Sequence, residues 1–109
     1  MSRDTIQLLS LLDNGNVKAF LRVIRAGESN QTDDAYRMMF GGELFDSFAD
    51  HPRRAFLSKW GWTSAAGAYQ FMCAVPGKVK TDTWGGLVRK YGFEDFSPQT
   101  QDVAALALI

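Results

Sequence analysis

The sequence predicts an α+β domain that is mainly helical and contains one small β-hairpin region. Apolar residues recur at helical spacing within residues 17–28, and the Ser-Pro pair at 97–98 is a typical helix start. The Gly-Gly pair at 41–42 lies between aromatic and apolar residues, which favours short strands or a surface loop within residues 31–52. With 109 residues, 46% of them hydrophobic, the chain is long enough for a single domain with a modest core.

The N-terminal part is predicted to form two helices. Residues 6–12 are the most apolar short run near the start, but they are too few to cross a bilayer, so a short packing helix is expected. The turn at residues 13–16 places Asn16 where it can cap a second helix. That helix is predicted to begin at Val17 and to end near Glu28 to Asn30.

Two more helices are predicted in the C-terminal half. Residues 75–81 are expected to form an exposed loop, and a helix follows over residues 82–92, where Gly92 is a natural terminator. The last helix begins with Ser97 as the N-cap and Pro98 at its first position.

The last predicted helix has an unusual end. Asp102 lies in its early turns, and residues 103–109 then contain no charged group, glycine or basic last turn. A helix that is apolar nearly all round must be covered, so further protein absent from this chain is expected to cover it. The sequence therefore predicts a domain whose C-terminal part is missing and that self-associates through this helix.

Composition excludes several classes of function. Twelve basic and 12 acidic residues give a net charge of zero, so no general attraction to nucleic acid or to an anionic membrane is expected. One cysteine, Cys73, and one histidine, His51, exclude a disulfide framework and a zinc cluster, and both residues are expected to be structural. No secretory signal and no membrane-spanning run is present, so synthesis in the cytoplasm is expected.

Glu28 is the one acidic residue that the helical spacing places on an apolar stripe. At roughly 100° per residue it returns to within about 20° of Val17. A carboxyl group there loses solvation of its charged form, which raises its pKa and suits it to donate a proton in glycoside cleavage. Spacing alone leaves an alternative open, namely a glutamate at a frayed helix end turned out to water.

Several stretches resemble one known family. "GES" at 27–29 and "SAAGAYQFM" at 64–72 resemble the two-part signature of the lysozyme-like lytic transglycosylases. "GGELFDSFADHPRR" at 41–54 and "DFSPQTQDVAAL" at 95–106 resemble the corresponding stretches of the bacteriophage lambda endolysin family, in the same order and at similar spacing. The similarity runs from about Lys18 to Ile109 and implies a lysozyme-like fold.

The resemblance implies a phage or prophage endolysin that degrades peptidoglycan. Such an enzyme cuts the β-1,4 bond between N-acetylmuramic acid and N-acetylglucosamine and leaves a 1,6-anhydro ring. Glu28 matches the family's catalytic glutamate, which protonates the leaving oxygen and then accepts the proton of the muramic acid 6-hydroxyl. Ordinary glycosidases need a second carboxylate, whereas here the substrate supplies the nucleophile. No cofactor or metal is implied, and the protein would act on the cell wall after release from the host cytoplasm.

The resemblance also assigns a substrate-binding set, namely Ser29, Tyr36, Tyr69 and Gln70. Tyr69 and Gln70 match the family's cleft segment, where a ring face and an amide hold a sugar and its N-acetyl group. Core packing is the alternative for Tyr69. Ser29 either hydrogen-bonds near Glu28 or simply ends the helix, and Tyr36 either lines the groove or packs under it.

The remaining candidates are expected to be structural. A second carboxylate is not required, and turn formation or solvated charge is predicted for its five candidates, Asp33, Asp34, Glu43, Asp46 and Asp50. Core packing is predicted for Trp60, Trp62 and Trp84.

The sequence departs from the family in three places. Residues 1–15 are interpreted as an N-terminal extension, residues 73–80 as an insertion, and roughly the last third of the usual domain as absent. Two hypotheses follow, an active endolysin and a truncated, inactive relic that serves as a structural or binding module. Retention of Glu28, Tyr69 and Gln70 favours the enzyme, and loss of the C-terminal segment favours the relic.

Overall fold

The structure, a computed structural model, describes the backbone of residues 3–28 and 33–108 and the side chains of residues 5–24 and 34–108. Within these ranges it combines helices with a two-stranded antiparallel sheet, which confirms the predicted α+β class. No helix in this part of the chain is long and apolar enough to cross a membrane. The elements in chain order are α1 (Arg3–Leu11), α2 (Gly15–Glu28), the 3-10 helix η1 (Asp33–Arg37), β1 (Phe56–Ser58), β2 (Gly61–Thr63), α3 (Thr83–Tyr91) and α4 (Pro98–Leu108).

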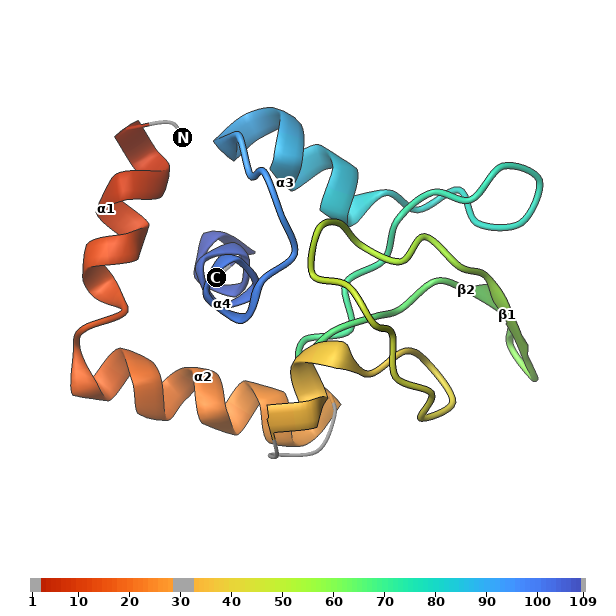
Figure 1. The fold of residues 1–109 in the computed structure, drawn as a ribbon, viewed down its shortest axis with the longest axis horizontal. Coiled ribbons are helices and arrows are strands. Elements are labelled where there is room, and N and C mark those ends of the chain that lie inside the picture. The colour runs from red at the N-terminus through yellow and green to blue at the C-terminus, as the bar shows by residue number, and fades with distance from the viewer. Residues whose placement is uncertain (1–2, 29–32, 109) are drawn as a thin grey trace.

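Helix α4 lies at the centre of the helical part, and α1 and α2 contact it from two sides (Figure 1). Thr100, Gln101 and residues 103–105 are buried, and Leu108 is the only exposed apolar residue of α4. The expectation that this helix needs cover from protein outside the chain is therefore wrong for most of its length. Self-association through α4 stays a prediction, because the structure describes a single chain.

Helix α2 begins at Gly15, two residues earlier than predicted, and its cap is Asn14 rather than Asn16. The Asn14 side-chain oxygen accepts hydrogen bonds from the backbone N–H of Asn16 at 2.8 Å and of Val17 at 3.2 Å. Leu21 is buried on the inner face, whereas Phe20 is exposed on the outer face. The apolar stripe facing the core is therefore narrower than the spacing predicted.

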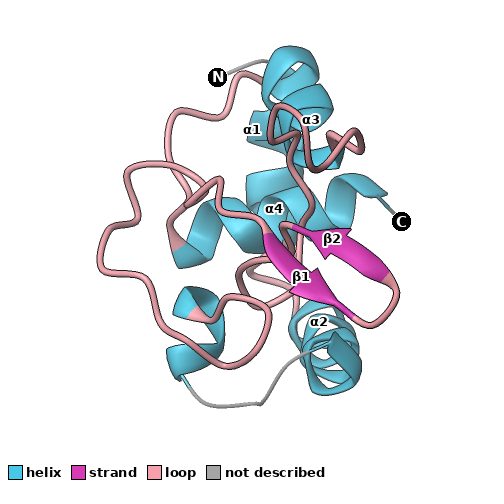
Figure 2. Ribbon diagram, turned by 90° about the vertical axis from the view of Figure 1, so that its right-hand side faces the viewer, coloured by secondary structure: helices cyan, strands magenta, loops and turns pink. Residues whose placement is uncertain are grey.

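The regular strands lie after the region where the hairpin was predicted. Within residues 31–52, Met38 and Leu44 form one isolated antiparallel bridge around the Gly-Gly turn, and no strand is described. The sheet is formed instead by residues 56–63, with Leu57 paired to Trp62 (Figure 2). The hairpin forms here because Gly61 allows a tight turn. The backbone has a φ of +115° at Gly61, and glycine adopts this conformation without strain.

Helix α3 begins and ends as predicted. The Asp82 side chain accepts a hydrogen bond from the Gly85 backbone N–H at 3.3 Å, and Gly92 ends the helix in the left-handed conformation. The preceding segment differs from the exposed loop predicted over residues 75–81, because Val75 and Val79 form a bridge and Val79 is buried.

Trp84 is the centre of an aromatic core. Its ring is fully buried and stacks nearly parallel to Phe93, with ring centroids 5.6 Å apart, while Phe96 meets it edge-on at 4.7 Å. The prediction of core packing is therefore right for Trp84. It is wrong for Trp60 and Trp62, which lie on the hairpin and are 87% and 43% exposed.

His51 and Cys73 are buried side by side and act as structural residues. His51 Nε2 lies 2.7 Å from the Phe71 carbonyl oxygen, and Nδ1 accepts a hydrogen bond from the Arg53 backbone N–H at 2.9 Å. This pair of partners assigns the neutral tautomer protonated at Nε2. The Cys73 thiol lies 3.3 Å from Nδ1, and burial raises its pKa. The thiol is therefore not an activated nucleophile.

Stability should fall in mild acid because of His51. Burial lowers the pKa of His51 below its ordinary value of 6.5, so the unfolded chain takes up the proton first as the pH falls. The free energy of unfolding is therefore expected to be level above about pH 6.5 and to decline below it, by at most about 1.4 kcal/mol per pH unit.

Urea titrations between about pH 5 and pH 7.5 measure this slope, in a range above that in which Asp and Glu ordinarily titrate. His51→Gln is the control, because it removes the only histidine and should flatten the profile. An equal slope in the variant would contradict the assignment to His51.

Candidate functional site

The candidate site lies between the middle of α2, η1 and the first turns of α4, which contribute residues to one pocket. The structure describes α2 as far as Glu28, the first residue of the predicted end at 28–30. The Glu28 side chain and the whole of Ser29 lie outside the described residues, and their roles stay predictions.

Two tyrosine hydroxyl groups meet on one carboxylate in this region. The Tyr36 hydroxyl donates to Asp102 Oδ1 at 2.9 Å, and the Tyr69 hydroxyl donates to the same oxygen at 2.6 Å. Tyr36 belongs to η1, Tyr69 to the segment before α3, and Asp102 to α4, so three distant parts of the sequence converge here. Hydrogen bonds to an ionised acceptor are stronger than neutral ones, and these hold both phenol rings in place.

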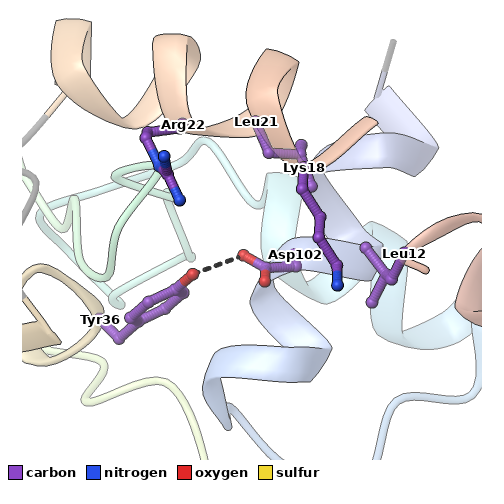
Figure 3. A pocket seen from close by; sticks show the side chains of 6 residues that line it. All are labelled: Leu12, Lys18, Leu21, Arg22, Tyr36 and Asp102. Carbon is purple, nitrogen blue, oxygen red and sulfur yellow. Dashed lines mark hydrogen bonds between the residues drawn. The ribbon is translucent and has the colours of Figure 1, made fainter. Parts of the chain in front are cut away.

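A pocket of about 230 Å³ opens beside this cluster. Lys18, Leu21 and Arg22 of α2 line one side of it, and Tyr36 and Asp102 line the other, together with Leu12 (Figure 3). Lys18 and Arg22 bring positive charge to one side of the pocket, and the other side offers the Tyr36 phenol and the Asp102 carboxylate. Such a mixture of donors, acceptors and apolar surface is suited to a polar ligand rather than to an apolar one.

Gln101 fixes the segments that carry the two tyrosines. Its amide oxygen accepts from the Ala68 backbone N–H at 2.9 Å, and its amide nitrogen donates to the carbonyl oxygens of Tyr36 at 2.9 Å and Phe96 at 2.8 Å. Gly67 is required beside it, because an added Cβ would collide with the Gln101 amide oxygen. A side chain at position 67 would therefore break this contact.

The predicted cleft pair contributes to the fold in a way that the sequence did not indicate. Tyr69 is largely buried, and Gln70 has a positive φ of 52°, which is uncommon outside glycine. The Gln70 amide nitrogen donates to the carbonyl oxygens of Met38 at 3.1 Å and Gly67 at 2.8 Å. Tyr69 therefore packs in the core, which was the alternative interpretation. The Gln70 amide nitrogen is hydrogen-bonded to the protein backbone, and sugar contacts of both residues stay predictions.

The candidates for a second carboxylate lie away from this cluster or in other interactions. Asp34 and Glu43 are exposed, and the Asp46 side chain is exposed 3.8 Å from Arg37. Asp50 pairs with Arg53 at 2.9 Å; burial opposes its charged form, but hydrogen bonds from Arg53 and from the His51 N–H lower its pKa overall. The Asp33 side chain lies outside the described residues.

Asp102 and Gln101 are the important residues that the sequence analysis missed. Both were passed over because an acid or amide in the first turns of a helix is ordinary. Their position in the sequence could have indicated a role, because both residues directly precede the apolar run 103–108. A helix that is buried along this run must also bury one of the two polar side chains. Among the described residues, no group of three or more His, Cys, Asp or Glu side chains could hold a metal ion.

Asp102→Asn should lower the free energy of unfolding by about 1–3 kcal/mol, because both tyrosine hydroxyl groups lose a charged acceptor. Denaturant unfolding measures this loss, and Asp46→Asn is the matched control because its side chain is fully exposed. In a double-mutant cycle, Tyr36→Phe and Tyr69→Phe should be non-additive through the shared oxygen. Strict additivity would show that the two hydroxyl groups act independently.

Comparison with known proteins shows the family of this chain. A family model described as Endolysin matches residues 18–109. The endolysin of Escherichia phage lambda is 31% identical over 103 aligned residues, which cover 88% of this chain and 60% of the relative. The chain thus spans about 60% of the length of the curated relative it matches.

Solved structures agree with this match. Bacteriophage lambda lysozyme complexed with a chitohexasaccharide gives a TM-score of 0.70 at 32% identity, covering 87% of this chain and 61% of that one. A second lysozyme structure from bacteriophage lambda gives a TM-score of 0.60 at 25% identity, covering 99% of this chain and 62% of that one. The lysozyme-like fold is therefore confirmed, and the chain belongs to the endolysin family.

Proposed function

We propose that this chain carries the catalytic carboxyl of a peptidoglycan-degrading endolysin, with Glu28 as general acid and then general base. The observation that carries the proposal is the pocket lined by α2, the helix that runs to Glu28. Leu21 lines this pocket together with Tyr36 and Asp102, whose side chains are hydrogen-bonded to each other. Family membership and the glycan-bound lysozyme neighbour support a saccharide as the ligand of this site.

The proposed reaction is lytic transglycosylation. Glu28 donates its proton to the glycosidic oxygen as the bond from C1 of N-acetylmuramic acid breaks. The 6-hydroxyl of the same sugar then bonds to C1 and gives its proton to the Glu28 carboxylate, which restores the acid. No water is consumed, and the products are a 1,6-anhydro end and a free 4-hydroxyl group.

The surroundings of Glu28 supply positioning rather than chemistry. Asp102 holds the Tyr36 and Tyr69 rings, and Lys18 and Arg22 add positive charge to the pocket from α2. The neighbouring polar groups offer hydrogen bonds to sugar hydroxyl and acetamido groups. Ser29 and Gln70 complete the proposed substrate-binding set, and the protein acts on the cell wall after release from the host cytoplasm.

A binding module without catalysis is the second candidate. It is favoured by the way in which Tyr69 and Gln70 are used inside the fold, since a relic would retain them for folding alone. This candidate predicts binding of peptidoglycan without product.

Glu28→Gln should abolish turnover of purified peptidoglycan and leave the unfolding transition unchanged, because the amide keeps the shape but cannot donate the proton. Glu43→Gln is the matched control, since Glu43 is exposed and should keep full activity. Chromatography of the products decides the reaction type: anhydro-muropeptides support transglycosylation, and new reducing ends indicate hydrolysis. Turnover by Glu28→Gln would remove Glu28 from the mechanism, and binding without any product would favour the module.

A further inference from the structure

Two basic side chains of α2 line the pocket of the candidate site without an ion-pair partner among the described residues. Lys18 and Arg22 are exposed, and Figure 3 shows both pointing from α2 toward the side of the pocket that Tyr36 and Asp102 line. The ion pairs in the described part of the chain are formed by other arginines. Both positive groups are therefore available to a ligand.

The spacing of Lys18 and Arg22 favours an anion as that ligand. The two residues lie four positions apart on one helix, so their side chains leave α2 on the same side, and like charges at this spacing repel each other. An anion bound between them would relieve this repulsion. Asp102 brings one negative charge to the pocket, and one oxygen of that carboxylate accepts both tyrosine hydroxyl groups. The lining therefore has an excess of positive charge.

Size and apolar surface limit what this anion can be. The pocket encloses about 230 Å³, below the range of about 300–1,000 Å³ that is typical for whole small-molecule ligands. It therefore suits one branch of a substrate better than consecutive sugar rings. Leu12 and Leu21 line it beside the charged groups and offer contact to small apolar side chains. A short peptide that carries both methyl groups and carboxylates matches this lining.

We propose that this pocket binds the carboxylates of the peptide stem that branches from N-acetylmuramic acid. The inference rests on the proposed function, because peptidoglycan supplies this branched sugar. The lactyl group of the sugar carries a short peptide that contains alanine and residues with free carboxylates. The alanine methyl group contacts Leu12 and Leu21, and the carboxylates bind the Lys18 ammonium and the Arg22 guanidinium through charge-assisted hydrogen bonds.

The distance along α2 fits such a branch. Arg22 precedes Glu28 by six residues of the same helix, which is a rise of about 9 Å. An extended peptide advances about 3.3–3.6 Å per residue, so a carboxylate on the second residue, beyond the lactyl group, lies about 10 Å from the sugar. A muramic acid held for cleavage at Glu28 thus carries its first free carboxylate as far as Arg22. Lys18 lies about one turn farther, where the following residues of the stem arrive.

An NMR titration of the full chain with two matched ligands tests the inference. N-acetylmuramyl-L-alanyl-D-glutamate carries free carboxylates, and its diamide has the same size without the charges. The parent chain should bind the acid about fivefold or more tighter than the diamide, with shifts of the Lys18 and Arg22 backbone signals. Lys18→Gln combined with Arg22→Gln should reduce this ratio to about one. Raising the salt concentration from about 50 mM to about 500 mM should weaken binding of the acid but not of the diamide.

The matched control removes two positive charges outside the pocket. Lys80 and Lys90 are exposed, and Lys80→Gln combined with Lys90→Gln should keep the preference for the acid. Urea unfolding of both double variants checks that the fold is intact, so that a lost preference reports on the pocket. Equal affinity of the parent chain for acid and diamide, or an unchanged preference in the pocket variant, would overturn the inference. Equal displacement of the acid by inorganic phosphate would show a general anion site and would overturn it as well.

Failure of this inference and failure of the proposed function give different results. Neither ligand contains a glycosidic bond, so the titration requires no turnover. Anhydro-muropeptides from purified peptidoglycan, without any preference for the acid, would refute the peptide-binding role alone. A preference for the acid without any product from peptidoglycan would refute the proposed reaction and leave the pocket assigned to the peptide stem.

Discussion

The fold depends on one buried side-chain amide. Gln101 is completely buried in α4 and joins the backbones of η1, of the segment after β2 and of the residue that leads into α4 itself. Replacement by an apolar residue would leave one N–H and two carbonyl groups without this partner, and each buried orphan costs about 1–3 kcal/mol. Three of the four hydrogen bonds that a glutamine amide can make are satisfied here, so its orientation is determined.

Asp102, the next residue of α4, forms the polar cluster of the candidate site. Because Gln101 fixes the backbone of Tyr36 and Ala68, the Tyr36 and Tyr69 hydroxyl groups both reach the same oxygen of Asp102. Helix α2 then closes the pocket with Leu21, Lys18 and Arg22. Helix α4 thus contributes both to the core and to one side of the pocket, and it is polar at its start and apolar afterwards.

Sequence reasoning recovered what depends on local rules. The Ser97–Pro98 start of α4, the Gly92 end of α3 and the end of α2 at Glu28 follow from capping and periodicity, and the family followed from motifs in order. The prediction failed where two residues suit the same local role, and where contacts between distant segments determine which side chains are buried. Asn14 and Asn16 are equally good caps by type, and nothing local shows that Trp84 is buried and Trp60 exposed. The role of Asp102 depends on partners 33 and 66 residues away.

This arrangement determines how loss of activity can be interpreted. Tyr69 and Gln70 match the motif of a cleft segment, yet their polar groups hold Asp102 and two backbone carbonyl groups. A variant at either position loses a folding contact together with any sugar contact, so its activity alone cannot separate the two. The Glu28→Gln substitution differs, because the amide keeps the shape of the side chain and removes only the proton that the proposed mechanism needs. Evidence for the mechanism must therefore come from Glu28 and from the product formed, while evidence from the tyrosines requires a parallel measure of stability.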